Sequence, residues 1–167
     1  MPAGQDTQPP GSADAVGGRG GAWVVGQIIL LAAIALAPRR LPGLPAWPVW
    51  LTRPAEIVGF LCGAAGASVA LAGGRALGTN LTAYPRPRDE ARLVQHGIYS
   101  HTRNPIYLGL ALGALGWALL RKSIPALALV GLLALFLDRK AQREEAWLAE
   151  KFPEFEQYRR RVGRWLG

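Results

Sequence analysis

Four apolar blocks dominate the pattern of hydrophobic and polar positions along the chain. They run over residues 22–37, 55–74, 105–120 and 124–137, and they contain no Asp, Glu, Lys or Arg except Glu56. A membrane-spanning helix needs about 20 apolar residues, with about 17 as the lower limit, so only the second block is long enough without flanking residues. Four consecutive blocks still predict an all-α polytopic membrane protein with about four transmembrane helices.

The third and fourth blocks are separated only by RKS at 121–123, which suffices for a tight turn. Ser123 can cap the fourth helix, and Pro125 falls in its first turn, where a missing N–H costs nothing. These two blocks therefore form a predicted helical hairpin. Its two ends return to the same side of the membrane, so the sequence before block three and the sequence after block four become neighbours.

Helix-forming residues continue past the fourth block, and no Gly or Pro interrupts them before Pro153. Residues 138–167 are therefore expected to form a cytosolic helical segment with a break at Pro153. The second half of this segment has an apolar stripe beside four arginines, which is typical of an interfacial helix on anionic lipid. The stripe consists of Phe155, Tyr158, Val162, Trp165 and Leu166.

The N-terminal residues 1–20 are rich in Pro, Gly and small polar residues, which predicts a disordered tail. Residues 21–167 then form a single predicted membrane domain. The first apolar block also has the character of a signal peptide, because AIALAPRR offers an A-x-A-like site before Pro38. Arg19 is the only positive charge ahead of that block and three further blocks follow, which favours a retained span.

The net charge of +8 is compatible with nucleic-acid binding, but the placement of the charges favours a membrane. With the N-terminus inside, five of the 19 Lys and Arg residues fall in the outer loops: Arg39, Arg40, Arg53, Arg121 and Lys122. By the positive-inside rule, the termini and the central loop are predicted to be cytoplasmic. The expected partners are membrane lipids, with neither nucleic acid nor an obligate protein partner.

Metal chemistry is not expected from this sequence. The chain has one cysteine, Cys62, in the middle of the second block, and only two histidines, His96 and His101. These residues are too few and too scattered for a metal site, and the cysteine is best interpreted as a small buried apolar residue.

The densest group of polar and aromatic residues is HGIYSHTRNPIY, which leads into the third block. Tyr99 and Tyr107 can offer ring faces and hydroxyls to a flat polar ligand, and Arg103 can pair with a carboxylate. Asn104 should be extended because it precedes Pro105, which should open the helix with free N–H groups. The alternative is a plain membrane boundary, with Arg at the headgroups, Tyr in the aromatic belt and Asn as a cap.

Glu144 and Glu145 follow the fourth block, on the side to which the hairpin returns the tyrosines. On an exposed helix face, a Lys140–Glu144 pair contributes only a few tenths of a kcal/mol. Beside an aromatic pocket, two carboxylates suit a ligand with hydroxyls and a positive centre. S-adenosylmethionine has both, and aromatic faces attract its sulfonium.

The two segments LVQHGIYSHTRNPIYLG and REEAWLAEKFPEFEQYRRRV, with a hairpin between them, resemble the isoprenylcysteine carboxyl methyltransferase family and its phospholipid methyltransferase-like relatives. The resemblance covers roughly the C-terminal half. The matching residues are Leu93, Val94, Gly97, Tyr99, Arg103, Pro105, Tyr107, Gly109, Glu144, Glu145, Phe152, Tyr158, Arg159, Arg160 and Val162.

The resemblance implies a multi-pass membrane enzyme, in the inner membrane if the source is bacterial. It would transfer a methyl group from S-adenosylmethionine to a lipophilic acceptor at the cytosolic face: an isoprenylcysteine-like carboxylate, a lipid or a small thiol. A basic residue one turn before Glu144 would orient the acceptor; Lys140 holds this place, and Arg139 or Arg143 could substitute. The implied cofactor-binding residues are Arg92, Leu93, Val94, Tyr99, Arg103, Asn104, Pro105, Ile106, Tyr107 and Glu144.

Three residues depart from the family pattern. Asn104 replaces a histidine, Pro153 replaces a glycine, and Lys140 replaces an arginine that would grip a carboxylate in a bidentate manner. No dedicated general base is evident, since His96 and His101 are only loose candidates. Two alternatives therefore stay open: a sterol-reductase-like enzyme that uses NADPH, and a membrane scaffold whose pocket has decayed.

Overall fold

The structure is a computed structural model that describes residues 20–81 and 92–166, and in these residues it contains five α-helices and no β-strand. The all-α prediction is confirmed. Apart from Gly20, the predicted disordered tail lies outside the described residues. The α-helices are α2 (Gly21–Leu36), α3 (Thr52–Leu77), α4 (Pro105–Arg121), α5 (Ile124–Lys151) and α6 (Phe155–Arg161), and the 3-10 helices are η1 (Val49–Leu51), η2 (Gly78–Asn80) and η3 (Gly97–Ser100).

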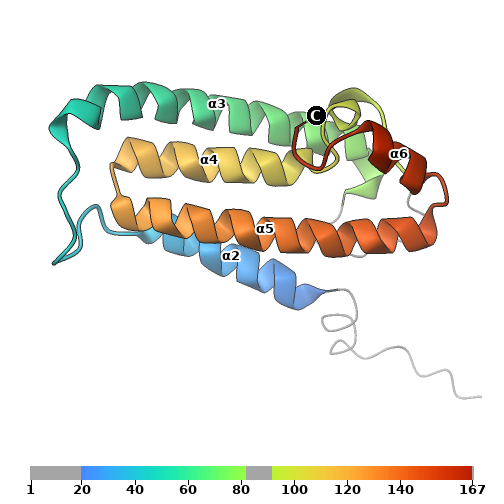
Figure 1. Ribbon diagram of the computed structural model, residues 1–167, viewed down its shortest axis with the longest axis horizontal. Coiled ribbons are helices and arrows are strands. Elements are labelled where there is room, and N and C mark those ends of the chain that lie inside the picture. Colours follow the sequence, from blue (N-terminus) through green and yellow to red (C-terminus); the bar gives the residue numbers. More distant parts are fainter. Residues whose placement is uncertain (1–19, 82–91, 167) are drawn as a thin grey trace, which may run out of the picture.

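The four longer helices lie side by side, in the order α3, α4, α5 and α2 (Figure 1). Helix α6 and the chain after it fold back over the end of the bundle where α4 begins (Figure 1). This end also carries η3 and the second half of α5. The predicted neighbours on either side of the hairpin therefore meet at one end of the molecule.

The hairpin between α4 and α5 is built as the sequence predicts. Lys122 adopts a left-handed conformation (φ 52°) and ends α4, and its N–H donates to the carbonyls of Ala118 and Leu119. The Ser123 hydroxyl then caps α5 by accepting from the Ala126 N–H at 3.1 Å. Helix α5 runs unbroken for 28 residues, so the expected extension beyond residue 137 is confirmed.

Helices α3 and α4 are in backbone contact through glycines. A Cβ built on Gly116 would lie 2.6 Å from the Gly59 carbonyl oxygen, and a Cβ on Gly109 would lie 2.6 Å from the Gly66 carbonyl oxygen. Small residues at such positions allow helices to pack closely without a large hydrophobic side-chain core. The close contact fixes where α4 begins relative to α3, and α4 begins at the site.

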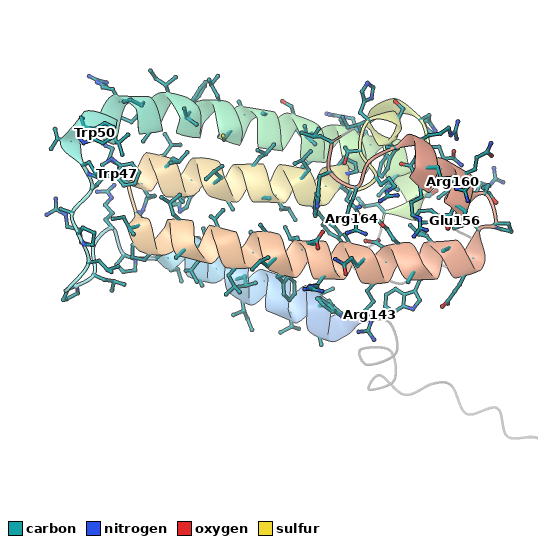
Figure 2. All side chains as sticks on the ribbon, viewed as in Figure 1. Trp47, Trp50, Arg143, Glu156, Arg160 and Arg164 are labelled. Carbon is teal, nitrogen blue, oxygen red and sulfur yellow. The ribbon has the colours of Figure 1, made fainter. Side chains whose placement is uncertain are left out.

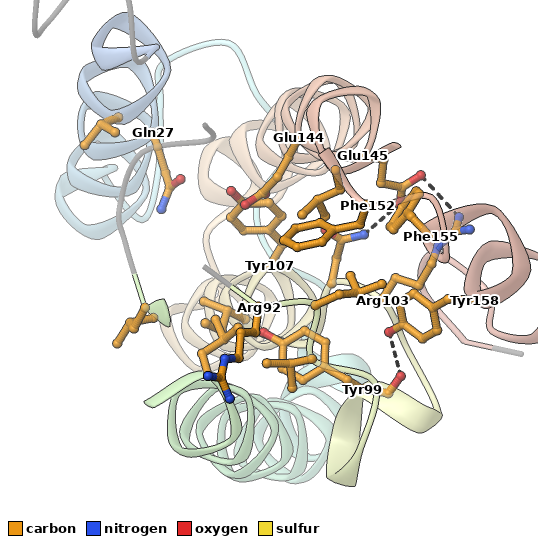
Figure 3. Close-up of a pocket in the computed structure, with 18 residues that line it drawn as sticks. Gln27, Arg92, Tyr99, Arg103, Tyr107, Glu144, Glu145, Phe152, Phe155 and Tyr158 are labelled. Carbon is orange, nitrogen blue, oxygen red and sulfur yellow. Dashed lines mark hydrogen bonds and ion pairs between the residues drawn. The ribbon is translucent and has the colours of Figure 1, made fainter. Parts of the chain in front are cut away.

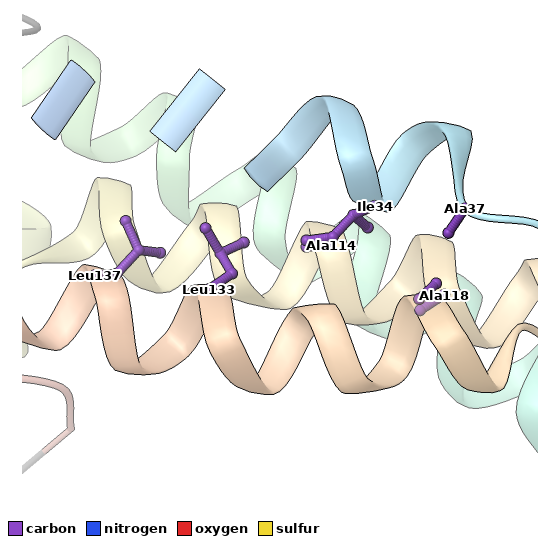
Figure 4. Close-up of a cluster of buried hydrophobic side chains, with 7 residues drawn as sticks. Ile34, Ala37, Ala114, Ala118, Leu133 and Leu137 are labelled. Carbon is purple, nitrogen blue, oxygen red and sulfur yellow. The ribbon is translucent and has the colours of Figure 1, made fainter. Parts of the chain in front are cut away.

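A hydrophobic core joins α2 to the hairpin. Ile34 from α2 is buried against the hairpin, where Leu133 and Leu137 from α5 are fully buried (Figure 4). Ala114 and Ala118 contribute the α4 side of this core. The core holds α2 along α5.

Among residues 20–81 and 92–166, one segment, Val49–Leu77, is long and apolar enough to cross a bilayer, and only 17% of its most apolar stretch is buried. Gly21–Leu36 and Pro105–Arg121 are apolar but shorter than that test requires, so the four-span arrangement remains a prediction. Large apolar side chains cover the outward faces of α2 and α3 (Figure 2). They include Val25, Ile28, Ile29, Ile57, Val58, Phe60 and Leu61.

The prediction of a lipid-facing stripe after Pro153 is wrong. Helix α6 has only seven residues, and Phe155, Tyr158 and Val162 are buried against other parts of the protein. Their partners are Leu93, Leu148 and Phe152. Amphipathic periodicity shows that one face of a segment is apolar, and here that face covers protein instead of lipid.

Replacing Gly109 with alanine tests the close contact of α3 and α4. The new Cβ would lie 2.6 Å from the Gly66 carbonyl oxygen and 2.7 Å from the Ala70 Cβ, so the helices must separate. We expect a loss of about 1–3 kcal/mol in the free energy of unfolding, measured by denaturant titration in detergent micelles. Gly113→Ala is the matched control, because a Cβ there meets nothing within 4 Å. Equal stability of the two variants would contradict the packing.

Candidate functional site

The segment that leads into α4, residues 97–104, is called the junction below, and it is bonded directly to α5. The Asn104 Nδ2 donates to Glu145 Oε1 at 3.0 Å, and the Arg103 guanidinium forms an ion pair with Glu145 Oε2 at 3.3 Å. The Glu145 and Arg103 side chains are only 6% and 8% exposed. The predicted proximity of this junction and the Glu144–Glu145 pair is therefore confirmed.

The chain after α6 binds the same carboxylate. Arg164 donates to Glu145 through Nε and Nη2, each at 3.1 Å, which is the bidentate geometry that a guanidinium and a carboxylate favour. Arg164 also pairs with Asp138 at 3.2 Å, and the Trp165 indole N–H donates to the same oxygen at 3.2 Å. Helix α5 therefore anchors the C-terminal segment at two points.

Hydrogen bonds to backbone carbonyls hold the C-terminal segment against the junction. The Tyr158 hydroxyl donates to the Tyr99 carbonyl at 2.6 Å. The Thr102 hydroxyl donates to the Arg164 carbonyl at 3.0 Å, and the Arg103 N–H donates to the Gly163 carbonyl at 3.0 Å. This segment, residues 158–165, forms one side of the site and is called the C-terminal clamp below.

A cavity of about 480 Å³ lies between the junction, α5, α2 and α6 (Figure 3). Its volume is in the range of small-molecule and cofactor sites, and most of its wall is apolar. The lining residues are Val24, Gln27, Leu77, Leu81, Arg92, Leu93, Val94, Tyr99, Arg103, Asn104, Ile106, Tyr107, Glu144, Glu145, Leu148, Phe152, Phe155 and Tyr158.

The cavity brings together all the sequence-predicted cofactor-binding residues except Pro105. Pro105 is instead buried at the first position of α4, against Gly73, where a Cβ would lie 3.0 Å from the Pro105 Cγ. The residue before it, Asn104, has φ −127° and ψ 56°, so it lies outside the helical region as expected but is not extended as the sequence predicted. The role of Pro105 is to start the helix that carries Tyr107 into the wall.

Glu144 faces the cavity from α5, close to Tyr107 (Figure 3). Burial raises the pKa of the Glu144 carboxyl to about 7, although a hydrogen bond with Tyr107 and the charge of Lys140 act in the opposite direction. A carboxyl group with this pKa sits between its two protonation states at neutral pH. A positive ligand in the cavity would favour the carboxylate form.

Tyr99 forms part of the opposite wall, and its side chain is buried. Burial raises the pKa of the Tyr99 hydroxyl well above its ordinary value, with smaller contributions from Glu144 and Tyr158. The ring therefore stays neutral and offers its π-face and an O–H group. Such faces attract cations.

The three candidate acceptor-orienting residues occupy different environments. Lys140 is only 2% exposed: its ammonium donates to Gln27 Oε1 at 2.6 Å and lies 5.0 Å from the centre of the Tyr107 ring. It therefore lies behind the cavity wall, and the interpretation of Lys140 as part of an exposed pair is wrong. Arg139 and Arg143 are exposed and do not line the cavity, and Figure 2 shows Arg143 pointing away from α5.

Sequence reasoning missed the contribution of α2 to the cavity. Val24 and Gln27 line it, and Gln27 is the only side chain of α2 that carries an amide, a hydroxyl or a charge. The presence of Gln27 as an isolated polar residue in an apolar block could have indicated that α2 contributes to the site. The loose base candidates, His96 and His101, are exposed and do not line the cavity.

The family of the chain follows from its sequence. A family model described as phospholipid methyltransferase matches residues 55–154, from the first turn of α3 to the residue before α6. The chain therefore belongs to the phospholipid methyltransferase family, a family of membrane-associated methyltransferases. The resemblance seen in the sequence motifs is confirmed at this level.

A curated relative covers more of the chain than the family model does. The chain is 33% identical over 143 residues to the cobalt-zinc-cadmium resistance protein CzcN of Cupriavidus metallidurans. The alignment covers 85% of this chain and 60% of that protein, so the chain spans less than two thirds of its relative's length. No solved structure matches the chain at a significant level.

Replacing Glu145 with glutamine tests the anchoring of the clamp. The variant leaves the buried Arg103 without its carboxylate partner and weakens the bidentate bond to Arg164. We expect a loss of about 3–5 kcal/mol in the free energy of unfolding, measured by denaturant titration. Glu150→Gln, an exposed change on the same helix, should alter it by less than about 0.5 kcal/mol. A Glu145→Gln protein as stable as the control would rule out the anchor.

The raised pKa of Glu144 predicts a pH-dependent stability. Between the ordinary glutamate pKa and about 7, the folded state holds a proton that the unfolded chain releases. The contribution of Glu144 to stability therefore falls as the pH rises through this interval and is constant above it. Thermal unfolding of the ligand-free protein should show Glu144→Gln gaining stability relative to wild type as the pH rises from about 4 to about 8. A constant difference across this range would contradict the assigned pKa.

Proposed function

We propose that the chain binds S-adenosylmethionine in this cavity and transfers its methyl group to a lipophilic acceptor at the cytosolic face of a membrane. The observation that carries the proposal is the convergence of Glu144, Tyr99 and Tyr107 on one cavity, whose wall also includes Tyr158 of the C-terminal clamp. Membership of the phospholipid methyltransferase family supports the reaction class. The cofactor and the acceptor are the proposed elements.

The residues present fit this cofactor. The tyrosine rings suit a sulfonium, and the Glu144 carboxylate suits either that charge or the ribose hydroxyls. Leu93 and Val94 offer an apolar wall and backbone groups to the adenine end. Lys140, behind Tyr107, adds positive charge on the side where the family carries a substrate-orienting basic residue.

The chemistry demands little of the protein beyond geometry. The cofactor supplies an electrophilic methyl group, which moves to the acceptor as the sulfur–carbon bond breaks. The cavity walls must hold the acceptor atom in line with that bond, because positioning can provide much of the acceleration. The mostly apolar wall of the cavity strengthens the electrostatic effect of Glu144 and Lys140.

The proposed setting is a multi-pass membrane protein with the cavity at the cytoplasmic end of the bundle. Val49–Leu77 is the clear candidate span, and α2, α4 and the apolar half of α5 would cross beside it. The exposed apolar side chains on α2 and α3 support contact with lipid tails. A lipophilic acceptor would then reach the cavity from the bilayer.

Calorimetry with S-adenosylhomocysteine on the purified protein tests the proposal. We expect binding in the micromolar range, and Glu144→Gln should weaken it about tenfold or more because a hydrogen bond to a charged group is lost. Glu150→Gln, which changes an exposed glutamate on the same helix, should bind like wild type. Absence of binding, equal affinity of Glu144→Gln, or a preference for NADPH would overturn the assignment.

The acceptor can be narrowed with radiolabelled S-adenosylmethionine and three sets of compounds: extracted membrane lipids, N-acetyl-S-farnesylcysteine and small thiols. Label that partitions into lipid extracts supports a lipid acceptor. Base-labile label indicates a methyl ester, since esters hydrolyse in alkali and methylated amines or thioethers do not.

A further inference from the structure

Helix α2 lies outside residues 55–154, which the family model matches, yet it contributes a polar side chain to the cavity. Gln27 stands alone among the apolar residues of α2. A polar side chain within an apolar helix is costly unless it has a partner, and in membrane helices such residues commonly mark functional positions.

The partner of Gln27 is the buried Lys140 ammonium, whose Nζ lies 2.6 Å from Gln27 Oε1. An ammonium group only donates hydrogen bonds, so the amide must present its oxygen to Lys140. This orientation turns the Gln27 NH2 group away from the lysine. Because Gln27 lines the cavity, the NH2 group is available on that side (Figure 3).

Packing of α2 on α5 fixes this arrangement. The ring of Phe136 lies against Gly26, where a Cβ would be 3.1 Å from it, and stacks at a tilt with Trp23 at 5.1 Å between ring centres. Phe136 and Lys140 are one turn apart on α5, and Gly26 precedes Gln27. The same contact that seats α2 therefore places the amide beside the ammonium.

The charge of Lys140 is not cancelled by an ion pair in the part of the chain that the structure describes. Its contacts are a neutral amide and the face of the Tyr107 ring at 5.0 Å, and the Glu144 carboxyl, one turn further along α5, also interacts with it electrostatically. A glutamate at position 27 would neutralise the charge of Lys140, whereas the neutral amide of a glutamine binds the ammonium and leaves its positive charge in place. An amide whose oxygen accepts from a cation is polarised, and its N–H groups become stronger donors.

We propose that Gln27 binds the methyl acceptor, and that its NH2 group, polarised by Lys140, donates to an oxyanion of that acceptor. The oxyanion is a carboxylate or a phosphate oxygen, and the lipophilic part of the acceptor lies along α2. This assignment rests on the proposed methyltransferase function. It makes α2 the element that recognises the acceptor, while the junction and α5 hold the cofactor.

Enzyme kinetics test the assignment with two probes, N-acetyl-S-farnesylcysteine for the carboxylate and phosphatidylethanolamine vesicles for the phosphate. Gln27→Met keeps the approximate size of the side chain and removes both its NH2 group and the oxygen that accepts from Lys140, so KM for the methylated probe should rise about tenfold. The Kd for S-adenosylhomocysteine should change by less than about twofold, because Gln27 does not hold the cofactor. Gln157→Met, at an exposed position of α6, should leave both constants unchanged.

A second measurement needs neither cofactor nor acceptor. The chain has three lysines, Lys122, Lys140 and Lys151, so acylation by an amine-reactive reagent can be assigned by mass spectrometry. Buried Lys140 should react slowest, should become several-fold more reactive in Gln27→Ala, and should stay protected in Gln27→Glu. In the kinetic assay, Gln27→Glu should nevertheless raise KM, because its carboxylate cancels the lysine charge and repels an oxyanion.

The outcomes separate this inference from the proposed function. Unchanged Lys140 reactivity in Gln27→Ala overturns the inference even if the chain is a methyltransferase. So does an equal loss of cofactor and acceptor binding in Gln27→Met, which indicates a purely structural role, and so does a wild-type protein that binds S-adenosylhomocysteine but methylates neither probe. Failure of S-adenosylhomocysteine to bind defeats the proposed function itself.

Discussion

The buried carboxylate of Glu145 holds two separate segments of the chain, the junction and the C-terminal clamp, against α5. It accepts from Asn104 at the start of α4, pairs with Arg103 in the junction, and binds Arg164 in the C-terminal clamp. A charge this deeply buried is stable only while its partners remain, because leaving it unpaired costs several kcal/mol. The junction and the clamp therefore cannot leave α5 independently, and the cavity between them keeps its shape.

The adjacent residues Glu144 and Glu145 have different roles, because successive side chains on a helix point in different directions. Glu145 faces the junction and the clamp, where cations and amides surround it. Glu144 faces the cavity, where Tyr107 is its hydrogen-bond partner and burial raises its pKa. The pair thus combines a structural carboxylate that is bonded to the junction and the clamp with a carboxyl group that faces the cavity, where a ligand can bind it. The helix extension beyond residue 137 is needed to present both.

Much of this arrangement could be predicted from local chemistry. The three-residue turn, the Ser123 cap and Pro125 determine the hairpin, and the hairpin determines which segments meet. The partner of an apolar face could not be predicted in the same way. Phe155 and Tyr158 have the periodicity of a lipid-facing stripe, but they pack on Leu93 and Leu148, because periodicity records that a face is buried and not what buries it. The hydrogen bond between Lys140 and Gln27 could not be predicted for a related reason. It joins two helices that are more than a hundred residues apart in the sequence.

Asn104 replaces the histidine of the family pattern. Its contacts therefore help to decide whether the cavity is still a functional site or the remnant of one. In a decayed site, nothing would preserve a hydrogen-bond partner for a polar side chain at this position. A polar side chain that is buried without such a partner destabilises the fold. Asn104 is only 8% exposed, and its amide donates to Glu145 while its backbone N–H donates to Thr102 Oγ1. A neutral histidine offers one ring N–H donor, and asparagine supplies an equivalent donor on a shorter side chain. The replacement thus keeps the hydrogen bond that joins the junction to α5, which favours a maintained cavity over a decayed one.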